Sequence, residues 1–262
     1  MILVDTHTHM HTIFNVEKFL DAALLHMTAQ AKADEQTDRA LCLTETRDQH
    51  FFKDLTSRMG ETGAGPWQAC HAPDSVSIRL DRASGHSLWL VAGRQIATSE
   101  RLEILCLGHD ADIPDHIHSL TELTPMILQL GGLPVLPWGF GKWTGGRGRA
   151  VKAFLEQGSV PDNICLGDNS NRPRLWPEPE AFAIARKKNI AILPGSDPLP
   201  LASTCADVGR YGLRMDGSLP AAAPWAHLRS RLANPDLSCV PYGKRESLPR
   251  FVWNQTRLRL PH

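Results

Sequence analysis

Short apolar runs alternate with stretches of helical periodicity along most of the chain. Strand character is found in residues 1–7, 39–45, 87–98, 102–108, 133–138, 163–168 and 190–197. Apolar residues recur at helical spacing in residues 15–33, 115–132, 149–158 and 178–189. Asn15 is a suitable N-cap for the first of these segments, and Gly131 and Gly132 end the second. This alternation predicts βα units around a largely parallel sheet.

Two stretches interrupt the alternation. Residues 57–87 are rich in glycine, proline and serine, which predicts an irregular insertion. Residues 240–262 form a C-terminal extension with several basic residues, and a solvated surface explains such a short cluster better than a nucleic-acid patch does. We expect a single domain over residues 1–262, because α/β barrels of this length commonly form one domain.

Composition and charge narrow the partners that can be expected. Lys+Arg and Asp+Glu each number 28, so net charge gives the chain no preference for nucleic acid or membrane. No apolar stretch approaches the roughly 20 residues of a membrane span. The six cysteines are widely spaced without a C-x-x-C pair, and the N-terminus lacks a secretory signal. These features predict a cytoplasmic protein with reduced thiols.

A histidine-rich segment, "DTHTHMH", closes the first apolar run. Side chains at i and i+2 of a strand share one face, so His7 and His9 can project together from its carboxyl end. Two such imidazoles can share one divalent ion, and Asp5 or Thr8 can support them from behind. A second H-x-H, His116 and His118, begins a helical segment, where residues two apart do not face each other.

Polar residues also follow other predicted strands, where parallel α/β folds place their active residues. They include Glu45, Asn169 and Asp197. Asp197 alone would be an ordinary turn residue before Pro198. Together with His7 and His9, it becomes a candidate metal ligand.

The motifs "DTHTHMH", "LTET", "GRQIATSERLEILCLG", "GGLPVLPWG", "GDNSNRP" and "ILPGSD" resemble, in this order, the polymerase and histidinol phosphatase (PHP) family. The resemblance covers roughly residues 1–215. It implies a distorted seven-stranded (β/α) barrel, similar to a TIM barrel, that binds one to three metal ions and hydrolyses phosphoesters. By this resemblance His7, His9 and Asp197 match family metal ligands.

The chain departs from the family pattern at four places. Thr44-Glu45-Thr46 stands where the family has T-D-H, and Gln95, Trp138 and Leu199 stand where it has a glutamate and two histidines. A three-metal cluster is therefore not expected. One ion, such as Zn, Mn or Fe, held by His7, His9, Asp197 and Glu45 would leave a position open for water.

A mononuclear site predicts hydrolysis in which the ion acidifies water and Asp197 acts as general base. Two alternatives remain open. The lost ligands also suit a catalytically degenerate barrel that binds no metal and serves to bind a ligand or partner. A single-ion site also suits an amidohydrolase-like enzyme that opens amides or lactones.

A glycine-rich segment, "WGFGKWTGGRGR", precedes the predicted helix at 149–158. Backbone amides and the positive side chains of Lys142 and Arg147 can hold an anion there, although flexible surface loops are also glycine-rich. Asn169 and Arg172 offer similar groups after another strand. The expected substrate is therefore a small phosphorylated or anionic molecule, with no specific nucleic acid and no membrane as partner.

Overall fold

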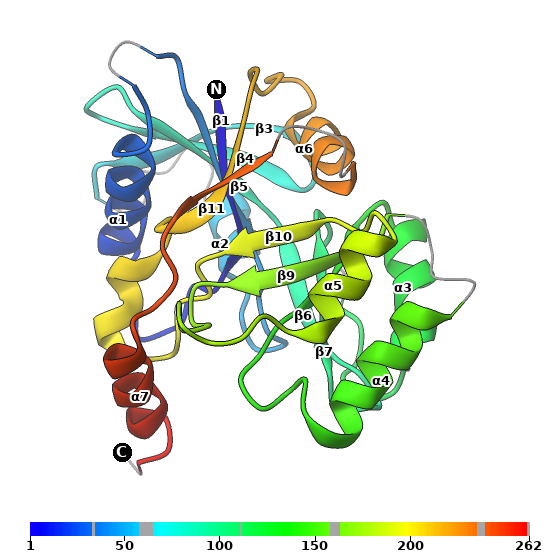
Figure 1. Ribbon diagram of the computed structural model, residues 1–262. Helices are drawn as coiled ribbons and strands as arrows, with labels where there is room; N and C mark the ends of the chain where they lie inside the picture. The colour runs from blue at the N-terminus through cyan, green and yellow to red at the C-terminus, as the bar shows by residue number, and fades with distance from the viewer. Residues whose placement is uncertain (33–34, 58–64, 111, 158–162, 235–238, 261–262) are drawn as a thin grey trace.

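A computed structural model describes all of the chain except residues 33–34, 58–64, 111, 158–162, 235–238 and 261–262 (Figure 1). The helices are α1 (Val16–Thr28), α2 (Phe51–Ser57), α3 (Leu120–Gln129), α4 (Gly145–Glu156), α5 (Glu180–Lys187), α6 (Pro224–Ala233) and α7 (Leu248–Arg257), with a short 3-10 helix η1 (Ala202–Asp207). Among these residues no helix is long and apolar enough to cross a membrane.

The strands form two mixed sheets. The seven-stranded sheet has the order β12 (Val240–Gly243), β11 (Tyr211–Met215), β1 (Ile2–Thr8), β2 (Asp38–Leu43), β5 (Ser87–Val91), β4 (Ser77–Arg82) and β3 (Trp67–Asp74). The five-stranded sheet has the order β10 (Ile192–Gly195), β9 (Cys165–Asn169), β8 (Leu133–Pro137), β7 (Glu103–Leu107) and β6 (Gly93–Ala97). Pairing is parallel for β1–β2–β5 and for β8–β9–β10, and antiparallel elsewhere.

The expected (β/α) barrel is wrong, because the two sheets do not close on one another. Both edges of β1 are already occupied, by β2 on one side and β11 on the other, so β1 forms no ladder with β10 in the described residues. Between β2 and β6 the chain makes only an isolated bridge, Glu45 to Arg94. β5, not β6, pairs with β2. Ala92 separates β5 from β6, and β6 belongs to the five-stranded sheet.

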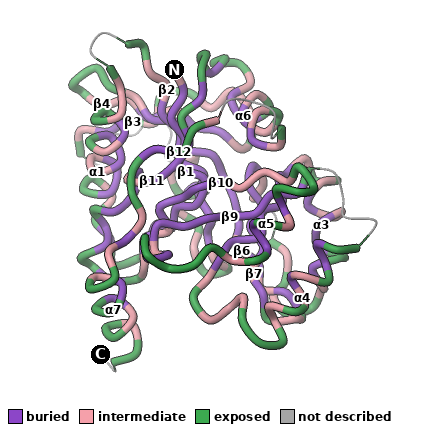
Figure 2. The backbone as a smooth tube through the Cα atoms, viewed as in Figure 1, coloured by how far each residue is buried: buried purple, intermediate pink, exposed green. Residues whose placement is uncertain are grey.

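Three apolar clusters hold these layers together. Alternate residues of β1 face opposite sides, as a strand requires: Leu3 packs in the cluster that contains α1, whereas Ile2 and Val4 pack in the cluster between the sheets. The third cluster lies between the five-stranded sheet and α3, α4 and α5, which cover its outer face (Figure 1). Figure 2 shows the strands β1, β9 and β10 as a continuous buried region at the centre of the molecule.

Several elements end where local sequence dictates. Asn15 caps α1 by accepting a hydrogen bond from the Lys18 amide at 2.9 Å, as the pattern predicts. Residues 57–87, expected to be irregular, instead contain β3 and β4, whereas 58–64 lie outside the described residues. The C-terminal extension supplies β12 and α7, and β12 pairs with β11.

Candidate metal centre

The structure brings the side chains of His7, His9 and Asp197 together at the carboxyl ends of β1 and β10. The His7 and His9 Nε2 atoms lie 3.0 Å apart, and Asp197 Oδ1 lies 3.5 Å from the first and 3.6 Å from the second. These are the ligand atoms of a possible metal-binding group in the described residues.

The spacing of the three atoms suits a first-row divalent ion. A triangle with these sides has a circumradius of about 2.0 Å, which matches the roughly 2.0–2.2 Å at which nitrogen and carboxylate oxygen bind zinc. The donor set of two imidazoles and one carboxylate is that of a site with an open position. The residues therefore fit one ion.

Burial favours the uncharged imidazole that a metal requires. His7 and His9 are only 4% and 5% exposed. Burial, assisted by His7, lowers the pKa of His9 to about 3, so its ring is neutral at neutral pH. Burial would raise the pKa of Asp197, but His7, His9 and Lys142 together hold that pKa below its usual value. A neutral His9 ring and an ionised Asp197 carboxylate are the protonation states that metal binding requires of these two residues.

The backbone of this site is held by Asp5, whose carboxylate is fully buried. It accepts hydrogen bonds from the amides of Ser196 at 2.8 Å, Gly209 at 2.9 Å and His7 at 3.2 Å. Because Ser196 precedes Asp197, Asp5 joins the strand that carries the imidazoles to the segment that carries the carboxylate. Thr8, the other residue expected to support the site, donates instead to the Cys42 carbonyl.

Asp197 itself adopts a left-handed backbone conformation, with φ of 47°. Its amide donates to the His7 carbonyl at 2.8 Å, and its carbonyl accepts from the Asn171 side chain at 2.6 Å. Its Oδ2 accepts from Asn169 Nδ2 at 2.8 Å. These contacts leave Oδ1 directed at the two imidazoles. Sequence reasoning missed Asn171, and its place in "DNSN" directly after a strand was the available signal.

The fourth expected ligand, Glu45, lies elsewhere. Its fully buried carboxylate accepts hydrogen bonds from the amides of Phe51 and Phe52 at the start of α2. Burial raises the pKa of Glu45 to about 7, against the lowering effect of these amides and Arg94. Glu45 is not in the group that gathers His7, His9 and Asp197.

The residues expected to bind the substrate are placed in different ways. Asn169 contacts Asp197 directly, and Lys142, which is ion-paired with Glu103, lies close enough to lower the pKa of Asp197. Arg147 donates to the carbonyls of Gly141 and Arg101.

Arg172 lies in a buried ion pair. It donates two hydrogen bonds of 2.7 Å to Asp168, and Tyr211 donates a third to the same carboxylate. A guanidinium satisfied in this way holds the end of β9 in place and offers few free donors.

Comparisons with known proteins show the fold. No protein-family model matches the chain, and no curated protein matches it in sequence. Among solved structures, PsfC from Pseudomonas syringae PB-5123 superposes with a TM-score of 0.61 at 18% identity, over 98% of this chain and 97% of PsfC. The lesion-specific endonuclease PfuEndoQ from Pyrococcus furiosus gives 0.54 at 12% identity, over 91% of this chain and 57% of its own length.

A third structure, Endonuclease Q with a 27-mer duplex substrate that carries an abasic lesion at the active site, gives a TM-score of 0.50 at 12% identity. It matches 99% of this chain and 67% of its own length. The expectation of a small anionic substrate with nucleic acid excluded is overturned by this finding, because a protein of similar fold takes a DNA duplex. The chain thus shares the fold of PsfC and of the Endonuclease Q proteins, and carries a possible metal-binding group formed by His7, His9 and Asp197.

Proposed function

We propose that this protein is a metal-dependent phosphoesterase of the PHP type that cleaves a phosphodiester of a nucleic acid. The observation that carries the proposal is the convergence of His7 Nε2, His9 Nε2 and Asp197 Oδ1 on one point, with both imidazoles buried and the carboxylate partly exposed. The likeness in fold to two structures described as Endonuclease Q supports the choice of substrate class.

The chain's own residues have distinct tasks in this proposal. A divalent ion held by His7, His9 and Asp197 would polarise the phosphoester and make an attacking water more acidic. Asp197, as the carboxylate of the group, is the proposed ligand and general base. Asn169 fixes its Oδ2, so that Oδ1 keeps its direction.

Positive charge beside the site comes from Lys142. The positive charge of Lys142 lowers the pKa of Asp197, and the same charge can attract a phosphate. Its ion pair with Glu103 must loosen for a direct phosphate contact. Glu45 remains a proposed fourth ligand only if its carboxylate leaves the amides of α2.

The test combines metal content with cleavage. The wild type and a His7→Ala/His9→Ala double variant are analysed for bound metal and assayed with Mn²⁺ or Zn²⁺ on labelled DNA duplexes, with and without an abasic site, and on single strands. We expect about one ion per chain and strand cleavage, both lost in the variant.

The chain provides a matched control in its second H-x-H pair. A His116→Asn/His118→Ala variant removes two histidines on the 109–119 segment, and asparagine tolerates the φ of 63° at position 116. This variant should keep both metal and activity. Absence of metal and of cleavage in the wild type, after incubation with excess ions, would overturn the proposal and favour a degenerate binding protein.

A further inference from the structure

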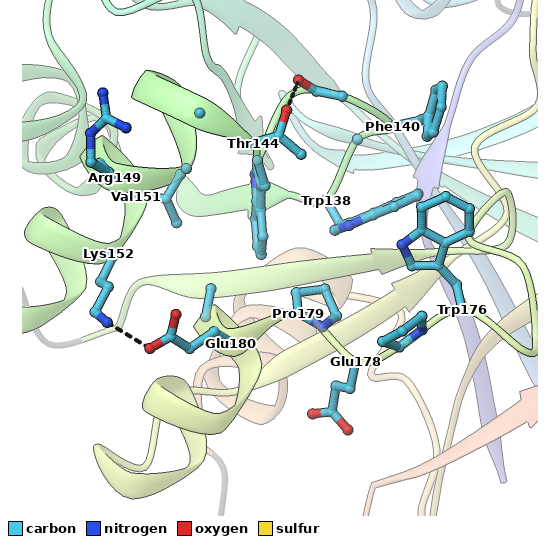
Figure 3. A pocket seen from close by; sticks show the side chains of 17 residues that line it. Trp138, Phe140, Thr144, Arg149, Val151, Lys152, Trp176, Glu178, Pro179 and Glu180 are labelled. Atoms are coloured by element: carbon cyan, nitrogen blue, oxygen red, sulfur yellow. Dashed lines mark hydrogen bonds and ion pairs between the residues drawn. The ribbon is translucent and has the colours of Figure 1, made fainter.

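A cavity of about 630 Å³ lies between the segment 138–152 and the segment 176–181 (Figure 3). Its volume falls in the range of pockets that hold small ligands or single groups of larger ones. Rings form part of its walls and are contributed by Trp138, Phe140, Trp143, Trp176, Pro177 and Pro179. We call it the tryptophan cavity.

The rings are held in place by contacts behind them. Trp143 packs edge-on against Phe182, with centroids 5.6 Å apart and planes at 80°. Phe140 and Trp176 meet edge-on at 5.9 Å, and both pack against Phe251 of α7. Phe140 and Trp176 are each 40% exposed, so they present ring surface to the solvent and to an incoming group.

Polar groups in the tryptophan cavity point to a ligand that accepts hydrogen bonds. In the described part of the chain, the indole N–H groups of Trp138, Trp143 and Trp176 donate to no protein atom. The indole nitrogens of Trp138 and Trp143 are not among the buried unpartnered atoms of the described residues, and Trp176 is 40% exposed, so these N–H groups are open to solvent and available to a ligand. At the far end Lys152 is paired with Glu180 (Figure 3) and Glu178 with Arg186, whereas Arg149 forms no ion pair with a described residue.

A short hydrogen-bonded path joins the tryptophan cavity to the metal centre. Asn169 Nδ2 donates to the Trp138 carbonyl at 2.7 Å and to Asp197 Oδ2 at 2.8 Å. The three residues lie at the carboxyl ends of the adjacent strands β8, β9 and β10. Two strand spacings are about 10 Å, which is comparable to the reach from a backbone phosphate to the far edge of its base.

We propose that the tryptophan cavity receives one unpaired base of the substrate strand while the adjacent phosphodiester lies at the His7–His9–Asp197 site. The inference rests on the proposed function for its substrate class. Flat aromatic side chains can stack on any base, and the indole N–H groups can donate hydrogen bonds to ring nitrogens or carbonyl oxygens of that base. An unpaired base is required, because a base inside a duplex cannot bring its faces to these rings.

The test measures binding without turnover, in the presence of a chelator. Two probes are used: a single-stranded 12-mer, and a strand of equal length whose sugars carry no bases. Because one stacked base is lost, Trp176→Ala should weaken binding of the 12-mer about tenfold and leave binding of the baseless strand unchanged. Trp176→Phe, which keeps a ring, should restore most of the affinity.

Trp253→Ala is the matched control, because Trp253 is a 60% exposed tryptophan of α7 that does not line the cavity. It should bind both probes as the wild type does. Equal loss for both probes in Trp176→Ala, or no loss for either, overturns the inference even if the enzyme cleaves DNA. Selective loss with the 12-mer supports it even if no cleavage is found, so the two proposals fail separately.

Discussion

The side-chain amide of Asn169 donates a 2.8 Å hydrogen bond to Oδ2 of Asp197, and this contact sets the direction of the carboxylate toward His7 and His9. Asn169 is 3% exposed, so water does not compete strongly for the bond. A carboxylate oriented before an ion arrives binds it more tightly than one that must be ordered first.

We therefore expect Asn169→Ala to lower metal affinity about 10- to 100-fold, the usual effect of losing a residue that orients a ligand. Chelator competition would measure it. Asn171→Ala is an informative comparison, because Asn171 donates to the backbone carbonyl of Asp197 and not to its carboxylate. An affinity unchanged in Asn169→Ala would show that Asp197 needs no such orientation.

The sequence predicted local structure well where the signals were local. The helix capped by Asn15 and the strands that became β8, β9 and β10 follow from periodicity and capping residues. The antiparallel pairing of β6 with β7 also follows from apolar runs around a polar turn, but the single strand predicted over 87–98 divides at Ala92 into β5 and β6, which belong to different sheets. These features depend on residues within a few positions of one another.

Long-range pairing was not predictable in this way. Nothing in "MILVDTH" indicates that β1 would have β11 as its second neighbour, and this pairing is one reason that no barrel closes. The partners of charged residues were equally hidden. Arg172 has the charge of a phosphate ligand, but Asp168, four residues before it, accepts two hydrogen bonds from its guanidinium. Glu45 has the chemistry of a metal ligand and lies at the start of α2 instead.

Gly195 gives a steric prediction for the metal centre. A Cβ at this position would lie 2.4 Å from the Cβ and 2.6 Å from the amide nitrogen of His7. Gly195→Ala should therefore push β10 away from β1, destabilise the fold by about 1–3 kcal/mol and weaken metal binding. Urea denaturation and metal analysis would measure the two effects. Gly85→Ala, with strained backbone but open space around it, should leave metal binding intact.

Asp5 gives a second stability prediction. Asp5→Ala would leave the amides of His7, Ser196 and Gly209 buried without their acceptor, and each such amide costs about 1–3 kcal/mol. We expect a loss of at least about 2 kcal/mol in the free energy of unfolding, together with weaker metal binding. A variant as stable as the wild type would mean that these amides find other acceptors.

The cysteines should differ sharply in reactivity. Cys42, Cys106 and Cys165 are fully buried, and burial raises the pKa of the latter two thiols to about 12. Cys70 is exposed. In a thiol-labelling assay at pH 8, Cys70 should react first, and the three buried thiols should react only after unfolding. Loss of the fast phase in Cys70→Ser would confirm its source, whereas rapid labelling of Cys106 would contradict the packing described.

The raised pKa of Glu45 predicts how stability depends on pH. Burial lifts it from 4.5 to about 7, so the folded chain binds this proton more tightly than the unfolded chain does. The contribution of protonated Glu45 to the free energy of unfolding is therefore fully present below pH 4.5, and it is lost as the pH rises toward 7. Glu45→Gln removes this titration. Both proteins are unfolded with a chelator present. Between pH 4.5 and 7.5, the free energy of unfolding of the variant should rise relative to that of the wild type by on the order of 1–3 kcal/mol.

Adding metal tests the alternative role of the same residue. If Glu45 stays on the amides of α2, a divalent ion should stabilise wild type and Glu45→Gln equally, because both keep His7, His9 and Asp197. If Glu45 moves to become the fourth ligand, the ion should stabilise the wild type more than the variant. The shift in unfolding midpoint with and without metal separates these outcomes, since loss of a direct ligand lowers the affinity of the folded state for the ion.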